Sequence, residues 1–291
     1  MISCIICSRK SDISAELKQN IQDTIGTDYE LIIIDNSHNR YSICSAYNEG
    51  VRRAKGNILI FMHEDVIFWS KQWGYIIEQR FFQYQDIGII GLLGGHYLPA
   101  TPCYWIDARV DSVNHIQSNG KEGNSKVMRI VCHQQYRSER TFVAACDGVF
   151  MAMPKCLFDE NLVRWDENVF RGFHFYDMDM SMQIHKIGLN IEILWDVLLE
   201  HKSCGDFNKM YLAGRDVWFY KWKQDLPIMC GVDLTQEQIE IANTNVGIAN
   251  AMYEAFVRNA SLLRSKEYRL GKFLLKPFFL IHRVLKRKKD L

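Results

Sequence analysis

Two acidic segments hold the residues whose types and spacing best suit chemistry. The first is His63, Glu64 and Asp65, directly after an apolar run. A hard carboxylate such as Asp65 is a preferred ligand for a divalent cation, and His63 can add an imidazole nitrogen that favours Mn²⁺ slightly over Mg²⁺. Such a cation would stabilise negative charge on bound phosphate oxygens. The segment is therefore a candidate metal site, and the alternative is a polar strand end with no further role.

The second segment contains Asp177 and Asp179, in a stretch with a helical pattern. A positioned carboxylate can act as a general base and take the proton from an attacking hydroxyl. Residues two apart on a helix lie about 200° apart around its axis, so both cannot point into one site. One of the two is therefore a candidate base. The alternative for the pair is structural, because acids at a helix start interact favourably with the helix dipole.

The elements that must position these residues alternate between strands and helices. Apolar runs at residues 2–7, 30–34 and 57–62 predict buried strands, with helical patterns between them. This order indicates a parallel sheet covered on both faces, and ligands of such sheets bind beyond the carboxyl ends of the strands. No G-x-G-x-x-G turn follows the first strand, which argues against a dinucleotide-binding domain. Polar segments follow all three strands, beginning at Ser8, Asp35 and His63.

The middle of the chain changes character after another apolar run at residues 87–93. Residues 94–140 are polar and contain prolines, which predicts a loop-rich insertion over a site. Residues 141–153 predict a strand that is interrupted at Gly148. Because Gly148 has no side chain, we expect a bound molecule to approach the backbone closely there.

Helical patterns dominate the rest of the chain. A helix is expected over residues 176–186 and closed by Gly188, followed by a strand over 191–195. His201 comes shortly after this strand and is either a metal ligand or a histidine with a structural hydrogen bond. From Leu234 onward the pattern is helical to near the end of the chain.

The composition limits the class of protein. The chain has 291 residues, of which 48% are hydrophobic and 24% charged, and this excludes disordered, collagen-like and coiled-coil proteins. A net charge of +1 argues against binding of nucleic acid by the whole surface. Nine cysteines, an odd number in apolar surroundings, indicate a reducing compartment. Without a secretory signal or a membrane-spanning run, a cytoplasmic location is expected.

The order of these motifs resembles family 2 glycosyltransferases of the GT-A fold over about residues 1–202. In that family an acidic residue after the second strand reads the nucleobase. A helix with Asn/Arg-x-Gly follows, and a D-x-D after the next strand holds a divalent metal on the sugar diphosphate. The D-x-D reads His-Glu-Asp here, so His63 replaces its first acid. The matching positions are Asp35, Asn48 with Gly50, and Asp65.

The resemblance implies a nucleotide-sugar donor of the UDP or GDP type and roles for the residues around it. Asp35 would contact the nucleobase or the ribose. In many members of the family, a histidine near the end of the catalytic domain also coordinates the metal. The ligands of Mn²⁺ or Mg²⁺ would therefore be Asp65, His63 and His201. Further donor contacts are expected at Ser8, Asn48, Glu64 and Gly148.

The resemblance implies that Asp177 is the general base. Family members commonly have Glu-Asp where this chain has Tyr176 and Asp177, and the Asp of that pair resembles the base that deprotonates the acceptor hydroxyl. We therefore take Asp177 as the base and Asp179 as a structural group. One base without an opposing second carboxylate implies a single displacement, which inverts the anomeric centre.

Together these observations predict the fold and its division. We expect an α/β domain of the GT-A type over residues 1–233, with a Rossmann-like, mostly parallel sheet and helices on both faces. Its nucleotide-sugar half would cover about residues 1–95 and its acceptor half about 96–233. Residues 234–291 would form a helical C-terminal appendage.

The predicted activity is metal-dependent and inverting transfer of a hexosyl group to a hydroxyl of a glycan or a lipid-linked glycan. A sugar nucleotidyltransferase is one alternative, although the segment after Ser8 lacks the glycines that its phosphate loop would need. The other alternative is an inactive binding scaffold that has lost its chemistry through His63 and Tyr176.

The end of the chain, residues 272–291, combines apolar and aromatic residues with Lys and Arg. It is too short and too charged to span a bilayer. A basic, aromatic-rich helix can lie on a bilayer, with its cations among anionic headgroups. We expect either such a contact at the inner face of the membrane or packing of the same apolar residues on the catalytic domain.

Overall fold

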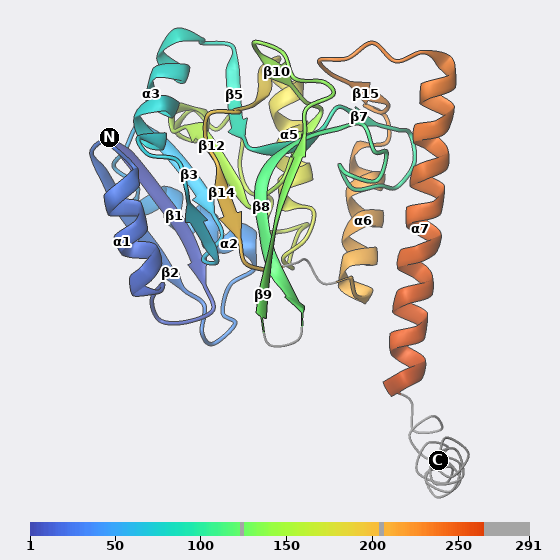
Figure 1. Ribbon diagram of the computed structural model, residues 1–291, viewed down its shortest axis with the longest axis horizontal. Coiled ribbons are helices and arrows are strands. Elements are labelled where there is room, and N and C mark those ends of the chain that lie inside the picture. The colour runs from blue at the N-terminus through green and yellow to red at the C-terminus, as the bar shows by residue number, and fades with distance from the viewer. Residues whose placement is uncertain (123–124, 204–206, 265–291) are drawn as a thin grey trace, which may run out of the picture.

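The computed structural model describes residues 1–122, 125–203 and 207–264 (Figure 1). It contains a seven-stranded sheet, a second six-stranded sheet, and two long helices near the end of the chain. Residues 272–291, for which we expect a membrane contact or packing, lie outside the described residues. None of the helices within the described ranges is long and apolar enough to cross a membrane.

The central sheet has the strand order β10-β13-β5-β12-β3-β1-β2. β1 pairs in parallel with β2 and β3, and β5 pairs in parallel with β13, while β12 runs antiparallel between β3 and β5. β10 is antiparallel to β13, so five of the seven strands point the same way and the predicted mostly parallel sheet is confirmed. The strands are β1 (Ile2–Ser8), β2 (Tyr29–Asp35), β3 (Ile58–Met62), β5 (Ile87–Gly91), β10 (Thr141–Phe142), β12 (Phe150–Pro154) and β13 (Asn190–Ile193).

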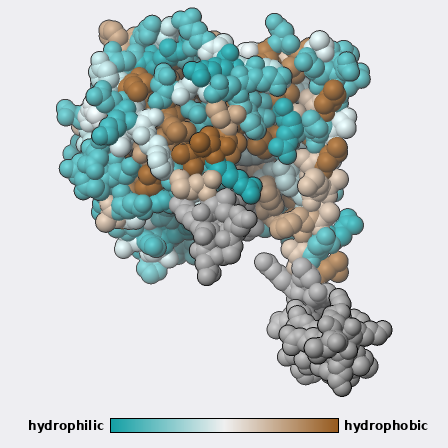
Figure 2. Space-filling model, viewed as in Figure 1, coloured by the Kyte–Doolittle hydropathy of each residue, from teal (hydrophilic) through white to brown (hydrophobic). Residues whose placement is uncertain are grey.

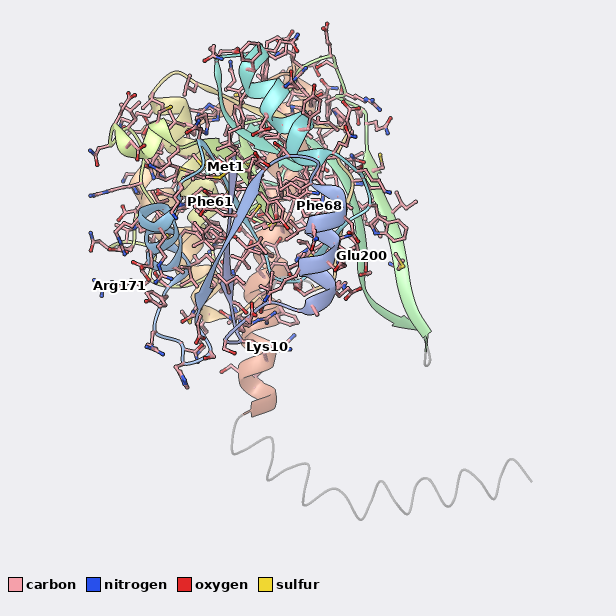
Figure 3. The ribbon with its side chains drawn as sticks, turned by 90° about the vertical axis from the view of Figure 1, so that its left-hand side faces the viewer. Met1, Lys10, Phe61, Phe68, Arg171 and Glu200 are labelled. Carbon is pink, nitrogen blue, oxygen red and sulfur yellow. The ribbon has the colours of Figure 1, made fainter. Side chains whose placement is uncertain are left out.

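Helices cover both faces of this sheet, as expected. α1 (Ala15–Thr24) and α2 (Ile43–Arg53) lie on opposite sides of β1 in Figures 1 and 3. Each begins after a serine whose hydroxyl accepts a hydrogen bond from a backbone N–H of the first turn. Gly50 lets α2 approach the sheet, because a Cβ there would lie 2.2 Å from Cγ2 of Ile5. The other helices of this part are α3 (Trp73–Gln83), α4 (Cys156–Asp159) and α5 (Tyr176–Lys186).

A second sheet takes much of its length from residues 94–140, where the sequence predicts a loop-rich insertion over a site, so the loop-rich part of that prediction is wrong. Its strand order is β11-β6-β8-β14-β4, and β9 pairs with β8. β8 contains buried polar residues such as Ser112 and Asn114, whose side chains hydrogen-bond to His96 and to the chain after β13, and a polar strand of this kind shows no apolar run. The strands are β4 (Val66–Phe68), β6 (Leu93–Gly95), β8 (Asp111–Glu122), β9 (Ser125–His133), β11 (Ala145–Cys146) and β14 (Leu199–His201).

The remaining boundaries follow from the way the chain passes between the two sheets. The apolar run 87–93 divides between β5 and β6, and the expected strand 141–153 divides into β10, β11 and β12. One long strand is predicted in each case because both sheets are buried at these points. The helix expected over residues 176–186 is confirmed as α5.

Two helices and a short strand pair complete the described chain. α6 (Lys209–Trp222), which is not predicted from the sequence, begins after Asn208, whose side chain accepts hydrogen bonds from two backbone N–H groups. α7 (Gln236–Arg264) confirms the helical pattern after residue 234 as far as the structure describes it. β15 (Ile228–Met229) pairs with β7 (Tyr97–Leu98). The division of the chain at residue 233 remains a prediction.

A buried ion pair joins β13 to α3 and to the chain before β10, and we expect it to contribute strongly to stability. Glu192 is 1% exposed, and its two oxygens accept hydrogen bonds from Arg80 and Arg140. Glu192→Ala leaves both guanidinium groups without this partner and should lower the free energy of unfolding in urea by about 3–5 kcal/mol. Asp86→Ala, which removes an exposed partner of Arg140, should cost about 1 kcal/mol or less. Equal losses would contradict this account.

Candidate metal and substrate site

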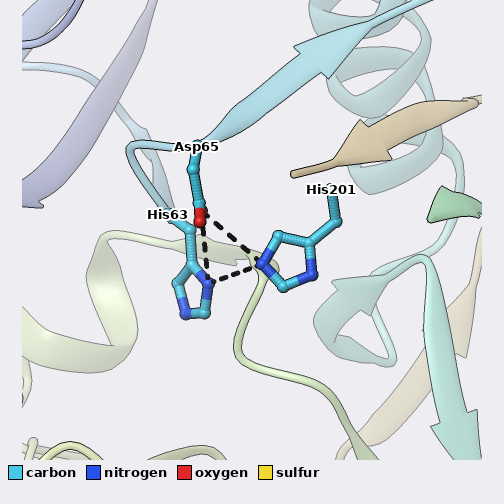
Figure 4. Close-up of side chains that lie close together, drawn as sticks. All are labelled: His63, Asp65 and His201. Carbon is cyan, nitrogen blue, oxygen red and sulfur yellow. Dashed lines mark hydrogen bonds and ion pairs between the residues drawn. The ribbon is translucent and has the colours of Figure 1, made fainter. Parts of the chain in front are cut away.

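His63, Asp65 and His201 meet at the carboxyl end of β3 (Figure 4). Asp65 Oδ1 lies 3.9 Å from His63 Nδ1 and 3.5 Å from His201 Nε2, and the two nitrogens are 3.4 Å apart. One carboxylate oxygen and two imidazole nitrogens, all within 4.8 Å of one another, fit a divalent cation such as Mn²⁺. The structure thus brings together the three residues that the sequence predicts as metal ligands.

The pairing of β14 with β4 explains why residues so far apart in the chain meet. His201 is the last residue of β14 and lies opposite Val66 of β4, the residue after Asp65. The N–H of Lys202 donates to the carbonyl of Asp65 at 2.9 Å. The backbone therefore fixes the spacing of Asp65 and His201 before any ion binds.

The protonation states of Asp65 and His63 suit metal binding, because a ligand must offer a free lone pair. Burial acts to raise the pKa of Asp65, but hydrogen bonds from His201 and Ser203 outweigh it and hold the pKa below its usual range. Burial lowers the pKa of His63, and the neighbouring His201 lowers it further. At neutral pH the cluster therefore holds an ionised Asp65 and a neutral His63.

The two departures from the family pattern, His63 and Tyr176, contact each other. His63 Nε2 lies 3.0 Å from the hydroxyl oxygen of Tyr176, and this hydroxyl donates to the carbonyl of Gly148 at 3.2 Å. Because the hydroxyl proton is used there, its oxygen accepts the Nε2–H of His63. Nδ1 then keeps the lone pair that faces Asp65 and His201. Tyr176 thus positions a candidate metal ligand.

This contact can be tested through metal affinity. Tyr176→Phe should weaken Mn²⁺ binding by about ten- to a hundredfold, because His63 loses the acceptor that fixes its tautomer and ring orientation. Titration calorimetry with Mn²⁺ measures the effect. Tyr97→Phe, which removes a hydroxyl that bonds to Asn243 instead, should leave the affinity unchanged. Wild-type affinity in Tyr176→Phe would mean that this hydroxyl does not position His63.

The side chain of Tyr176 packs directly against Gly148. From the sequence we expect a bound molecule to approach this glycine, but the structure places another residue of the chain there. A Cβ at this position would lie 2.1 Å from the hydroxyl oxygen of Tyr176. The glycine is therefore needed to admit Tyr176, whether or not a ligand binds. Gly148 still borders the cavity described next, so a donor contact there stays a prediction.

A cavity of about 340 Å³ lies directly beside the histidine and aspartate cluster. His63 and His201 form part of its wall, together with two carboxylates, Asp147 and Asp177. Most of the remaining wall is apolar and comes from strands β6, β8 and β9, from the loop residues 104–106 and 173–175, and from single residues of α6 and α7. Aromatic rings predominate in this wall, among them Tyr104, Trp105, Phe173, Phe207, Tyr211 and Tyr253.

Asp177 lies in the first turn of α5, inside this cavity, and is 2% exposed. Its Oδ2 accepts hydrogen bonds from the Tyr104 hydroxyl at 2.5 Å and from the Gly148 N–H at 3.0 Å. Burial, and then the charge of Asp147, raise the pKa of Asp177 to about 7. A carboxyl with this pKa is well matched to general-base work near neutral pH.

Asp179 serves the fold, as expected for a residue two positions from Asp177. It is 1% exposed, and its Oδ1 accepts hydrogen bonds from Trp222 Nε1 and lies 2.7 Å from Lys221 Nζ. Its Oδ2 accepts from the amide of Gln183 at 2.8 Å. These contacts join α5 to the end of α6, so Asp179 is a structural group that does not line the cavity.

Three predicted donor contacts lie together at the carboxyl ends of β1, β2 and β3. The Ser8 hydroxyl donates to Oε2 of Glu64 at 2.5 Å, and Oε1 of Glu64 accepts from Arg9 Nε at 2.9 Å. Asp35 lies opposite Ser8 in the register of β1 and β2. Hydrogen bonds from Ser37 lower the pKa of Asp35, so it is ionised at neutral pH. This edge is adjacent to the metal cluster, as the sheet order requires.

Asn48 is engaged in packing and does not line the cavity. Its amide donates to the carbonyl of Trp165 at 2.9 Å and to Glu167 Oε2 at 3.2 Å, which joins α2 to the loop before α5. The nearby Gly50 packs against Ile5. The Asn-x-Gly motif is therefore accounted for by contacts within the chain, and a donor contact from Asn48 stays a prediction.

His115 is a cavity residue that the sequence did not reveal. Its Nε2 lies 3.2 Å from Oε1 of Gln117, whose amide nitrogen donates to the carbonyls of His201 and Ser203. Oε1 must therefore accept, so Nε2 of His115 carries the proton and Nδ1 is an acceptor. Nδ1 is buried and has no partner among the described residues. If β8 were predicted from the sequence, His115 would be placed on the same face as Val113 and Gln117, because residues two apart share one face of a strand.

Comparison with known proteins places the chain in a family. The sequence model of the Glycosyltransferase like family matches residues 1–212. The chain belongs to this glycosyltransferase-like family. The match agrees with the resemblance noted from the motifs and with an α/β fold of the GT-A type. No curated protein matches this glycosyltransferase-like chain.

Several solved structures are similar to the chain at low sequence identity. GalNAc-T7 with UDP, GalNAc and Mn²⁺ is 14% identical with a TM-score of 0.49, and the match covers 84% of this chain and 54% of that one. The chain thus spans about half the length of GalNAc-T7. The mannosyltransferase PcManGT from Pyrobaculum calidifontis, with GDP-Man and Mn²⁺, is 13% identical with a TM-score of 0.45 over 99% and 87%. TarS 1–349 from S. aureus, with UDP-GlcNAc, is 10% identical with a TM-score of 0.45 over 70% and 59%.

Proposed function

We propose that the chain transfers a hexosyl group from a UDP- or GDP-type nucleotide sugar to a hydroxyl of a glycan or lipid-linked glycan. One observation carries the proposal: the cluster of His63, Asp65 and His201 borders a cavity that Asp177 also lines. A metal site and a base of suitable pKa thus adjoin one substrate-sized space. A leaving diphosphate at the cluster and an acceptor hydroxyl in the cavity would meet between them.

The residues that would hold Mn²⁺ or Mg²⁺ are His63, Asp65 and His201. The ion, when bound, would stabilise the charge that develops on the leaving diphosphate. Donor contacts from Ser8, Asp35 and Glu64 at the adjoining strand ends belong to the same proposal, because a nucleotide extends from its diphosphate along this edge.

The chemical step that this chain's own residues would perform is proton removal. Asp177 takes the proton of the acceptor hydroxyl, while Tyr104 and the N–H of Gly148 hold Oδ2 in place. Oδ1 accepts only from the Met178 N–H among the described residues, so a lone pair remains for the acceptor. The aromatic wall lowers the polarity around this step and strengthens its electrostatic interactions.

We propose inversion at the anomeric centre, with Asp147 as the carboxylate that could compete with this assignment. Asp147, which the sequence alone does not single out, lines the cavity beside Asp177. Its oxygens accept hydrogen bonds from Val149 N–H and Trp105 Nε1, which leaves it poorly disposed to act as a nucleophile. Proton NMR of the first product formed distinguishes the two outcomes, since retention would assign the nucleophile role to Asp147.

The proposed function is tested by thermal unfolding with nucleotides, with and without Mn²⁺. UDP or GDP should stabilise the protein only when the metal is present. A panel of UDP-, GDP- and dTDP-sugars, tested for hydrolysis and transfer, then identifies the donor. An inactive scaffold would show binding without turnover, and a nucleotidyltransferase would instead consume a nucleoside triphosphate.

The rate should also depend on pH in a direction set by Asp177. Only the ionised carboxylate can accept the proton, and its pKa is raised to about 7. Transfer under kcat/KM conditions should therefore fall about tenfold per pH unit below about pH 7 and level off above it. A profile that stays flat from pH 5 to 8 would contradict Asp177 as the base.

A cytoplasmic location at the inner face of the membrane is part of the proposal, because a lipid-linked acceptor would be held there. Residues 272–291, whose sequence is basic and rich in aromatic residues, would contact the membrane. Removing these residues should release the protein from anionic vesicles without loss of metal-dependent nucleotide binding.

A further inference from the structure

Helix α7 has two faces with different surroundings. On one face Tyr253 lines the aromatic cavity, and its hydroxyl donates to Asp107 Oδ1 at 2.7 Å. Asn250, one turn earlier, donates to the carbonyl of Pro102 at 2.7 Å. Large apolar side chains stand exposed elsewhere on the helix, with exposed fractions between 54% and 65%. This apolar row consists of Ile241, Ile248, Met252, Phe256 and Leu262.

The apolar row forms one continuous stripe. At about 100° per residue, its five members fall within an arc of about 120° around the helix axis. The charged residues of α7 between Ile241 and Leu262 are Glu254 and Arg258, and both lie outside this arc. Glu254 lies 3.7 Å from Arg215 of α6 instead. Figure 2 shows hydrophobic residues along the edge of the molecule that α7 forms. Monomeric soluble proteins rarely expose such a stripe without a partner.

We propose that the apolar row of α7 lies on an anionic lipid bilayer and thereby places the cavity next to a lipid-linked acceptor. This inference rests on the proposed transferase function. Met252 and Tyr253 are neighbours in the chain, one in the row and the other in the cavity wall. A single helix, about 10 Å across, therefore separates the lipid surface from the substrate space.

Charge and size favour a bilayer over another protein. Residues 265–291, which follow α7 directly, contain nine Lys or Arg and two acidic residues, so the row continues into a basic sequence. Interfacial helices combine an apolar face with such cations. A stable protein interface needs about 20–30 residues from each partner, many more than this row of five. The end of α7 also extends beyond the body of the molecule in Figures 1 and 3, where a flat surface can reach it.

Sedimentation with vesicles tests this proposal on the full-length chain. The wild type should pellet with vesicles of phosphatidylcholine and phosphatidylglycerol (7:3) and less with phosphatidylcholine alone. M252E/F256E should weaken the partition at least about tenfold, because two side chains that enter the acyl boundary become charged. The matched control is Phe82→Glu, which places the same charge at an 82% exposed position of α3, on the other side of the molecule.

The outcomes separate this inference from the proposed function. Mn²⁺-dependent stabilisation by nucleotides should be the same in all variants, since none of the changed side chains lines the cavity. If M252E/F256E does not fold, Ile248→Glu tests the same row at a separate turn. Wild-type partition in a folded row variant overturns the proposal, as does a wild type that ignores anionic vesicles. Light scattering that shows a dimer broken by the row variant would overturn it too, and would assign the row to an interface between copies. Vesicle binding without any nucleotide binding would leave the bilayer contact of the apolar row in place, but it would defeat the proposed function and with it the placement of the cavity next to an acceptor.

Discussion

Asp177→Asn should lower the rate of sugar transfer by about 10² to 10⁴ while the donor binds as in the wild type. The amide keeps the size of the carboxyl and can still accept a hydrogen bond from Tyr104, but it cannot take a proton. Single-turnover rates at saturating donor measure the chemical step. Mn²⁺-dependent thermal stabilisation by nucleotide reports donor binding in the same sample.

A stability measurement shows that the Asn variant is folded. The pKa of Asp177 is raised in the folded state to about 7, so the stability linked to its protonation is present below about pH 4 and is lost as the pH rises through 7. The Asn variant lacks that loss and should unfold at a temperature equal to or above that of the wild type at pH 8. Reduced activity in a protein of this stability can then be assigned to chemistry.

Asp179→Asn is the matched control. Asp179 pairs with Lys221 and Trp222 outside the cavity, so its replacement should lower the unfolding temperature and leave the rate of the folded enzyme within a few-fold of the wild type. If Asp179→Asn is the inactive variant and Asp177→Asn is not, the base has been assigned to the wrong residue. Full activity in both would point to another base, with Asp147 the next carboxylate in the cavity.

Asp65→Ala should abolish Mn²⁺-dependent binding of UDP or GDP, a loss of more than about a hundredfold. Asp65 supplies the only carboxylate of the cluster, and a cation that bridges phosphates loses its anionic ligand in this variant. His63→Ala should cause a smaller loss, about ten- to a hundredfold, because a water molecule can replace a neutral ligand. Calorimetry with Mn²⁺ and nucleotide measures both.

The controls for this series separate metal binding from folding. Asp159→Ala removes an exposed carboxylate that pairs with Lys155 on α4 and should change neither binding nor unfolding temperature. Metal-dependent nucleotide binding that survives undiminished in a folded Asp65→Ala variant would contradict the assignment of the site. Equal losses in Asp65→Ala and His63→Ala would make His63 as essential a ligand as Asp65.

Local patterns predict a large part of the fold and one half of the site. β1 and β3 are buried almost throughout, so their apolar runs are continuous, and Ser8 and Asp65 follow from the carboxyl ends of these neighbouring strands. α5 is predicted with its observed bounds because its helical pattern and the closing Gly188 are both local signals. Parallel strands that end at one edge then place Ser8, Asp35 and Glu64 together without knowledge of the rest.

The other half of the site depends on contacts between distant segments. His201 reaches Asp65 through the pairing of β14 with β4, and no local pattern encodes a pairing across more than a hundred residues. The cavity wall takes Tyr211 from α6 and Tyr253 from α7, on elements whose packing cannot be derived from periodicity. The reason for Gly148 cannot be predicted from the sequence either, because the residue that requires a glycine there, Tyr176, becomes its neighbour only in the tertiary structure. Buried polar strands such as β8 are missed by a search for apolar runs. Their polar side chains can be buried because hydrogen bonds satisfy them.

The most direct test of the central claim is anomalous diffraction from crystals grown with Mn²⁺ and UDP or GDP. We expect an anomalous peak within coordination distance of His63 Nδ1, Asp65 and His201 Nε2, with the diphosphate of the nucleotide on the same ion. A nucleotide bound without this peak, or a peak at a different place in the chain, would contradict the claim that these three residues form the metal centre of a glycosyltransferase.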